Sequence, residues 1–175
     1  YVGVQNVFAN KPPQFTVMAW AKPRSDMLDS VVVSQSSGPS TGRCYLFAIW
    51  IAGEKRFYFS VNNGGDTGGN EMFISPFSSM VPAADTWYHL AGVFTGSSVK
   101  LYVNGQLDSE LPYSGELCTP DVPVDIGKKW NGNWWNGLID EVKIYNYALS
   151  ASEVQQEYTA HAPTTCANEC SSSGI

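Results

Sequence analysis

The sequence predicts an all-β protein of antiparallel strands that ends in one short helix, and three observations support this. Aromatic residues form 13% and charged residues 15% of the 175 residues, and the chain contains 16 glycines and 10 prolines. This composition fits many short strands joined by turns better than helices. Apolar and polar residues alternate with a period of two in several segments. Asn104-Gly105 follows one of these segments, and this pair favours the type I′ turn of a β-hairpin.

The predicted strands follow one another with turn residues between them, in a chain whose length suits one domain. Loops rich in Ser, Gly, Pro or Asn occupy residues 36–42 and 62–70. The strands are predicted at 1–8, 15–23, 31–35, 44–52, 55–62, 72–77, 91–94, 99–103, 124–127 and from 138 onward.

A capping box predicts the helix. Ser150 stands three residues before Glu153, a spacing that lets each side chain bind the other's backbone amide, so we expect a helix over about 150–160. We therefore predict a domain over residues 1–160 and a separate tail over residues 161–175. The tail consists mainly of small residues and contains Cys166 and Cys170.

The stretch from 130 to 149 contains an unusual acid. If the alternation after Gly137 is regular, Asp140 lies on one strand face with Leu138, Val142 and Ile144. Ile139, Glu141, Lys143 and Tyr145 then lie on the opposite face. A carboxylate among aliphatic side chains must be hydrogen-bonded, paired with a cation or bound to a metal ion.

Four segments resemble the laminin G-like, concanavalin A-like lectin-glucanase family. They are Tyr1–Val4, the Phe-Thr-Val-Met-Ala-Trp-Ala-Lys-Pro run from Phe15, the segment from Trp87 to Gly105, and Gly-Leu-Ile-Asp-Glu-Val-Lys-Ile-Tyr from Gly137. The third is the most specific, and the resemblance covers residues 1–160. It implies an antiparallel two-sheet β-sandwich, a jelly roll, in an extracellular or cell-surface protein. It also implies a non-catalytic module that binds glycans or other proteins.

The resemblance implies a structural Ca²⁺ at Asp140. In this family main-chain carbonyls of the N-terminal strand and of a nearby loop complete the shell, and Ca²⁺ takes six to eight oxygen ligands. The alternative is that Asp140 accepts hydrogen bonds from loop amides.

The tryptophan-rich loop is the predicted ligand site. Trp130, Asn131, Asn133 and Trp134 combine aromatic faces, on which sugar rings stack, with adaptable amides, and they predict binding of a polysaccharide or a glycoprotein glycan. Exposed tryptophans equally suit a protein interface. The resemblance places Trp135 in the core and makes Trp87 and His89 a packing motif.

Several functions are excluded or disfavoured. The net charge of −6 and the scattered basic residues argue against nucleic acid. No apolar run approaches the roughly 20 residues of a membrane span, and no signal peptide is visible, so a secreted protein would be a mature form or a fragment. The sequence contains no Glu-x-Asp-x-x-Glu, Gly-x-Ser-x-Gly, His-Glu-x-x-His or phosphate-loop motif. We therefore predict that the protein is not an enzyme.

The disulfide candidates are Cys44, Cys118, Cys166 and Cys170, and four cysteines allow three pairings that the sequence leaves open. A zinc site in the tail is disfavoured because the tail lacks further ligands.

An alternative function is self-assembly. In the family that the chain resembles, a strand precedes the segment at residue 1 and pairs with the closing strand. Its absence here predicts an open sheet edge, unless the chain is a fragment. Such an edge, or the cysteine tail, could join copies into a homo-oligomer, an extracellular filament or a surface layer.

Overall fold

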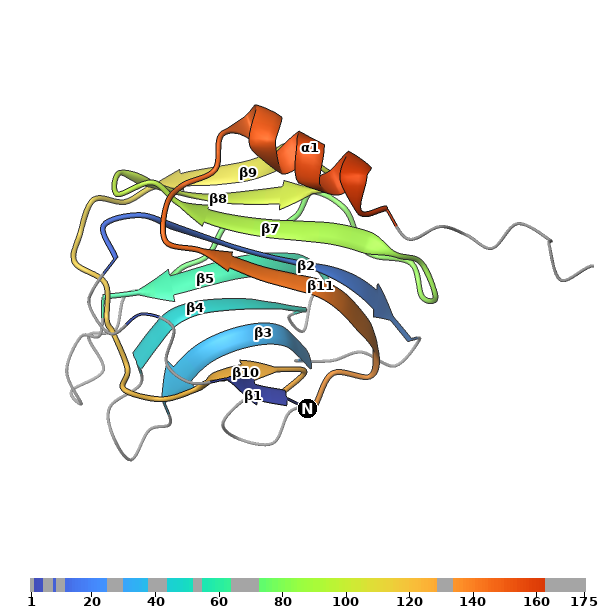
Figure 1. The fold of residues 1–175 in the computed structure, drawn as a ribbon, viewed down its shortest axis with the longest axis horizontal. Coiled ribbons are helices and arrows are strands. Elements are labelled where there is room, and N and C mark those ends of the chain that lie inside the picture. Colours follow the sequence, from blue (N-terminus) through green and yellow to red (C-terminus); the bar gives the residue numbers. More distant parts are fainter. Residues whose placement is uncertain are drawn as a thin grey trace, which may run out of the picture.

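A computed structural model of the protein has two antiparallel sheets packed face to face, with a helix on the outer side of one of them (Figure 1). The structure describes residues 2–4, 8, 12–24, 30–37, 44–51, 55–63, 73–128 and 134–162. The prediction of an all-β, antiparallel two-sheet jelly roll with one C-terminal helix is confirmed.

The first sheet has the strand order β1-β10-β3-β4-β5-β6 and the second β11-β2-β7-β8-β9. Their bounds are β1 Val2–Val4, β2 Phe15–Pro23, β3 Ser30–Ser37, β4 Cys44–Ile51, β5 Phe57–Asn62, β6 Phe73–Ile74, β7 Tyr88–Phe94, β8 Ser98–Val103, β9 Gln106–Pro112, β10 Val124–Ile126 and β11 Gly137–Tyr145.

The core lies between the sheets and follows the period of two. Along β5, Phe57, Phe59 and Val61 point into the main core cluster. Gly92 in β7 faces this cluster, and a Cβ there would collide with the ring of Phe59. The two sheets can therefore approach closely at this point.

The predicted hairpin joins β8 to β9. Asn104 and Gly105 both have positive φ, 51° and 77°, as a type I′ turn requires. The Asn104 side chain also accepts a hydrogen bond from the His89 amide at 3.0 Å, which ties the turn to β7.

A β-bulge in β11 corrects the predicted faces of this strand. Asp140 pairs with Trp20 and Lys143 with Met18, so β11 has one residue more than β2 between these pairs. Glu141, with φ of 48°, lies in the bulge. The regular alternation that placed Asp140 with Val142 and Ile144 is therefore wrong, because the extra residue changes the phase.

After this correction the inner residues of β11 are Ile139, Val142 and Ile144, which pack against the main core. Asp140 lies on the outer face with Leu138, Lys143 and Tyr145. It is exposed, so its carboxylate is not embedded among aliphatic side chains.

The helix α1, Ala151–Ala160, begins at the predicted capping box. Ser150 Oγ accepts from the Glu153 amide at 3.3 Å, and the Glu153 carboxylate accepts from the Ser150 amide at 2.7 Å. The helix lies on the outer face of the second sheet (Figure 1). Its buried Val154 belongs to a second apolar cluster with Met18, Ala91, Val93, Tyr102 and Leu149.

One cysteine pairing is resolved. Cys44 and Cys118 form a disulfide across 74 residues of sequence, while Cys166 and Cys170 lie outside the described residues. It connects the start of β4 to the segment between β9 and β10. A cross-link over such a distance stabilises the fold by about 4 kcal/mol in the chain-entropy account, mainly by restricting the unfolded chain.

His89 lies in an aromatic cage under α1. It is 2% exposed, and its ring centroid lies 5.4 Å from that of Trp20 and 6.0 Å from that of Tyr158. Nδ1 is buried and has no hydrogen-bond partner among the described residues. Burial lowers the pKa of His89 from its usual 6.5 to about 4; Glu157 opposes the shift, and Lys143 and His161 add to it.

We expect His89 to make stability fall in mild acid. Between pH 6.5 and 4 the unfolded chain binds a proton at this position and the folded protein does not. The stabilisation is thus fully present above pH 6.5 and is lost as the pH falls toward 4, by about 1.4 kcal/mol per pH unit. Urea denaturation between pH 7 and 4.5 measures this loss.

A His89→Phe variant should keep the aromatic packing and show a smaller loss over the same range. His161→Gln should keep most of the loss, because burial, the largest cause of the pKa shift of His89, is unchanged. Equal pH dependence in the unaltered protein and His89→Phe would contradict this role for His89.

Candidate functional site

Of the four predicted ligand-binding residues, Trp134 lies within the described residues. Its side chain is 56% exposed. It forms an isolated β-bridge with Lys128, and the Lys128 ammonium lies 5.7 Å from the centre of its ring. A cation over one face of an indole is attracted by the π-electrons. Trp130, Asn131 and Asn133 lie outside the described residues.

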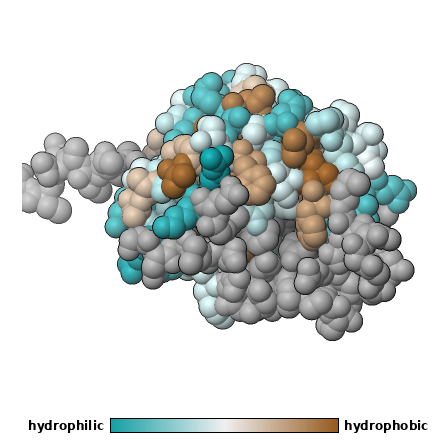
Figure 2. Space-filling view, turned by 180° about the vertical axis from the view of Figure 1, so that it is seen from behind, coloured by the Kyte–Doolittle hydropathy of each residue, from teal (hydrophilic) through white to brown (hydrophobic). Residues whose placement is uncertain are grey.

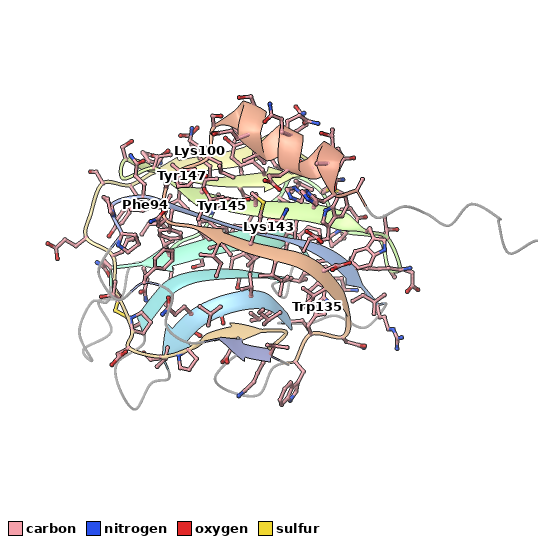
Figure 3. All side chains as sticks on the ribbon, viewed as in Figure 1. Phe94, Lys100, Trp135, Lys143, Tyr145 and Tyr147 are labelled. Carbon is pink, nitrogen blue, oxygen red and sulfur yellow. A yellow bond between two sulfur atoms is a disulfide. The ribbon has the colours of Figure 1, made fainter. Side chains whose placement is uncertain are left out.

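Trp135 anchors this segment to the body of the protein. Its amide donates to the Gly127 carbonyl at 2.9 Å, its indole N–H donates to the Leu138 carbonyl at 3.2 Å, and its half-buried ring packs against the main core. Figure 3 shows Trp135 near the start of β11. The adjacent tryptophans thus differ in environment, since Trp135 packs inward and Trp134 is largely exposed.

The chain around Gly137 fixes where this segment lies. A Cβ at Gly137 would collide with the carbonyl of Lys22, so glycine allows β11 to start close against β2. One residue earlier, the Asn136 carbonyl accepts from the Arg24 amide at 3.0 Å. Trp134 therefore stands two residues from a backbone hydrogen bond that lies next to the pairing of β2 with β11.

Asp140 offers little that would hold a metal ion by itself. One carboxylate oxygen accepts from the Glu141 amide at 2.8 Å, which is the hydrogen-bonded alternative considered for this residue. Among the described residues, no group of three or more His, Cys, Asp or Glu side chains could hold a metal ion. Because Ca²⁺ takes six to eight oxygens, an ion at Asp140 would depend on main-chain oxygens, and it stays a prediction.

The structure adds a hollow that the sequence did not indicate. It has a volume of about 270 Å³ and lies between the end of β11 and α1, lined by Tyr145, Tyr147, Leu149, Glu153, Gln156, Glu157 and Ala160. Tyr147 is 47% exposed, and the two tyrosine rings meet edge to face at 5.5 Å. Figure 3 shows both tyrosines toward the end of β11 opposite to Trp135.

Of the two glutamates that line this hollow, Glu157 is paired with a cation. Glu157 accepts from Lys143 at 2.8 Å and from the Tyr145 hydroxyl at 2.9 Å. The hydrogen bond from Lys143 holds the pKa of Glu157 below its usual value. Burial and the hydrogen bond to Glu157 raise the pKa of Tyr145 to about 12. This network joins α1 to β11, and Tyr147 is the aromatic group that it leaves available.

Large apolar side chains elsewhere on the surface are scattered. On the side opposite to Figure 1, apolar residues form small separate patches among polar ones (Figure 2). In the part of the chain that the structure describes, no helix has the length and apolarity that crossing a bilayer requires.

Comparison with known proteins agrees with the fold. The family model described as "Concanavalin A-like lectin/glucanases superfamily" matches residues 1–155. The chain is 23% identical over 172 residues to the adhesion G-protein coupled receptor V1 of Danio rerio; this covers 94% of the chain but 3% of that receptor's length.

Two solved structures are similar in fold. The first is a Bacteroides ovatus protein described as carbohydrate-binding, with a TM-score of 0.66 and 16% identity, covering 87% of this chain and 43% of that one. The second is domain 4 of the extracellular arabinanase AbnA from Geobacillus stearothermophilus, in complex with arabinotriose. Its TM-score is 0.62 at 20% identity, covering 85% of this chain and 68% of that one.

The calcium prediction can be tested by thermal unfolding. At about 5 mM free calcium, above the roughly 0.1–1 mM dissociation constants of extracellular modules, a bound ion should raise the unfolding midpoint relative to EDTA. Asp140→Asn should abolish the response, whereas Asp85→Asn, at another exposed aspartate, should retain it. Identical unfolding midpoints with calcium and with EDTA would contradict the prediction of a bound calcium ion.

Proposed function

The chain belongs to the concanavalin A-like lectin/glucanases superfamily, and we propose that it is a non-catalytic module of an extracellular protein that binds carbohydrate. The proposed ligand is a polysaccharide or a glycoprotein glycan, held by the aromatic segment that ends at Trp134. The observation that carries this proposal is the exposed Trp134 side chain, fixed beside Lys128 and next to the anchored Trp135.

The chemistry of this segment supports a sugar ligand. A pyranose ring presents C–H groups on its faces and hydroxyl groups at its edge. The exposed indole of Trp134 suits the C–H groups, and a lysine ammonium such as that of Lys128 can donate hydrogen bonds to hydroxyl oxygens. The similar Bacteroides and Geobacillus proteins bear a carbohydrate-binding description and a bound arabinotriose, respectively.

The disulfide supports an extracellular location. Disulfides persist in oxidising compartments and are rare in the cytosol, and Cys44 and Cys118 are joined. The similarity to an adhesion receptor agrees with this location. A non-catalytic role is proposed because the sequence lacks the carboxylate motif of the glucanases of this fold, and a fold alone confers no activity.

Trp134→Ala should weaken retention on immobilised polysaccharide by about tenfold or more, because loss of an aromatic anchor removes a dominant contact. The measurement is affinity electrophoresis over a panel of neutral polysaccharides. Tyr147→Ala is the matched control, since it removes an exposed aromatic ring at the other end of β11. Retention that depends on Tyr147 and not on Trp134 would move the site to the second hollow. No retention on any polysaccharide would contradict the proposal.

Self-assembly is the second candidate, and one observation favours it. In the described second sheet β11 is an outer strand, and Leu138 on it is 52% exposed. An open strand can pair with a neighbouring molecule.

The bulge and the charges of Asp140, Glu141 and Lys143 weaken this edge as a pairing surface, because such features protect sheet edges. We therefore expect light scattering after size-exclusion chromatography to give the mass of one chain at high concentration. A concentration-dependent oligomer that Leu138→Lys dissolves would instead support assembly through β11.

A further inference from the structure

We propose that another hollow, which Arg24 and Lys55 help to line and which we call the Arg24–Lys55 hollow, binds the acidic group of a charged saccharide. This acidic group is a carboxylate or a sulfate. This inference extends the proposed carbohydrate-binding function and rests on it. It concerns a different part of the surface from Trp134 and a different class of sugar.

The Arg24–Lys55 hollow lies at the mouth between the two sheets. It is lined by Pro23 and Arg24 after β2, Ile51 at the end of β4, Lys55 before β5, and the segment from Val81 to Ala84 that precedes β7. Figure 1 shows the end of β2, the turn before β7 and the start of β11 at the same end of the sandwich. The hollow is thus built by both sheets.

The backbone of this hollow is held on two sides. The Arg24 amide donates to the Asn136 carbonyl at 3.0 Å, and the Asp85 amide donates to the Pro23 carbonyl at 2.7 Å. Lys55 has φ of 59°, a conformation that costs energy for a residue with a side chain. The Arg24 side chain therefore projects from a backbone that hydrogen bonds hold in place. Through Asn136, Arg24 is also close in the structure to the Trp134 segment.

The charges make this hollow unusual for the protein. The chain has a net charge of −6, and Lys100 and Lys143 both pair with glutamates, at 3.5 and 2.8 Å. Arg24 and Lys55 are exposed, and within the described ranges neither side chain forms an ion pair or a hydrogen bond. The lining residues that the structure describes include no carboxylate. Two unpaired cations at one concavity attract an anion.

The ligand class follows from the rest of the lining. An arginine guanidinium can bind a carboxylate or sulfate with two parallel hydrogen bonds, and a lysine adds a point charge. Between them lies apolar surface, with Val81 56% exposed, which suits the C–H face of a ring. The volume of about 230 Å³ is below the roughly 300–1,000 Å³ of typical ligand pockets, so we infer that it takes a single charged sugar unit.

The test measures binding of defined oligosaccharides by isothermal titration calorimetry. The probes are tetragalacturonate, which carries carboxylates, a sulfated galactan tetrasaccharide, and neutral galactotetraose. The double variant Arg24→Gln/Lys55→Gln should weaken binding of an acidic probe by about tenfold or more. Whichever acidic probe the unaltered protein binds more tightly shows whether the hollow favours a carboxylate or a sulfate. Lys22→Gln/Lys100→Gln, with the same change in net charge, should leave binding within about twofold.

Three results would overturn the inference. In the first, both double variants weaken binding of an acidic probe equally. In the second, oligoglutamate binds as tightly as the acidic saccharides, which would indicate an acidic peptide ligand. In the third, the unaltered protein binds neither acidic probe. The thermal midpoint of Arg24→Gln/Lys55→Gln should match that of the unaltered protein, because both side chains are exposed. The control loses the surface ion pair of Lys100 with Glu110, which should lower its midpoint only slightly. If Trp134→Ala abolishes binding of neutral polysaccharides and the acidic probes do not bind the unaltered protein, only the inference about the Arg24–Lys55 hollow is contradicted. If acidic probes bind through Arg24 and Lys55 while all neutral ones fail, the role proposed for Trp134 falls instead.

Discussion

The pairing of β2 with β11 is the interaction on which the candidate sites depend. One face of β2 supplies Phe15, Val17, Ala19 and Ala21 to the core between the sheets. Its other face supports the cluster beneath α1 through Met18 and the stacking of Trp20 on Tyr158 at 5.6 Å.

Each end of this pairing positions one part of the candidate surface. At the end of β2, Arg24 contacts Asn136 and so fixes the start of β11 beside Trp134. At its beginning, the Thr16 hydroxyl donates to the Tyr147 carbonyl and accepts from the Leu149 amide. These two bonds hold the chain as it leaves β11 and place Tyr147 beside α1. A change that slipped this register would displace the aromatic groups at both ends together.

The sequence predicted those parts of the fold that local chemistry determines. The Asn104-Gly105 turn, the capping box at Ser150 and the alternation in β2 and β5 depend on a few neighbouring residues. The bulge at Glu141 was not predicted because it is defined by the pairing of β11 with β2, and the residue types in β11 do not indicate it. Both hollows were missed for a related reason, since their linings come from segments that only the folded chain brings together. The exposure of Trp134 agrees with the predicted aromatic ligand loop, which was inferred from tryptophans flanked by asparagines.

The disulfide has a consequence for a module that carries mechanical load. Because Cys44 and Cys118 are joined, the 74-residue stretch between them cannot be drawn out when the two ends of the domain are pulled apart. At about 3.4 Å per extended residue, the unfolded domain would lengthen by roughly 250 Å less than an uncrosslinked chain of the same size. Stretching under tension would thus be limited to the segments before Cys44 and after Cys118.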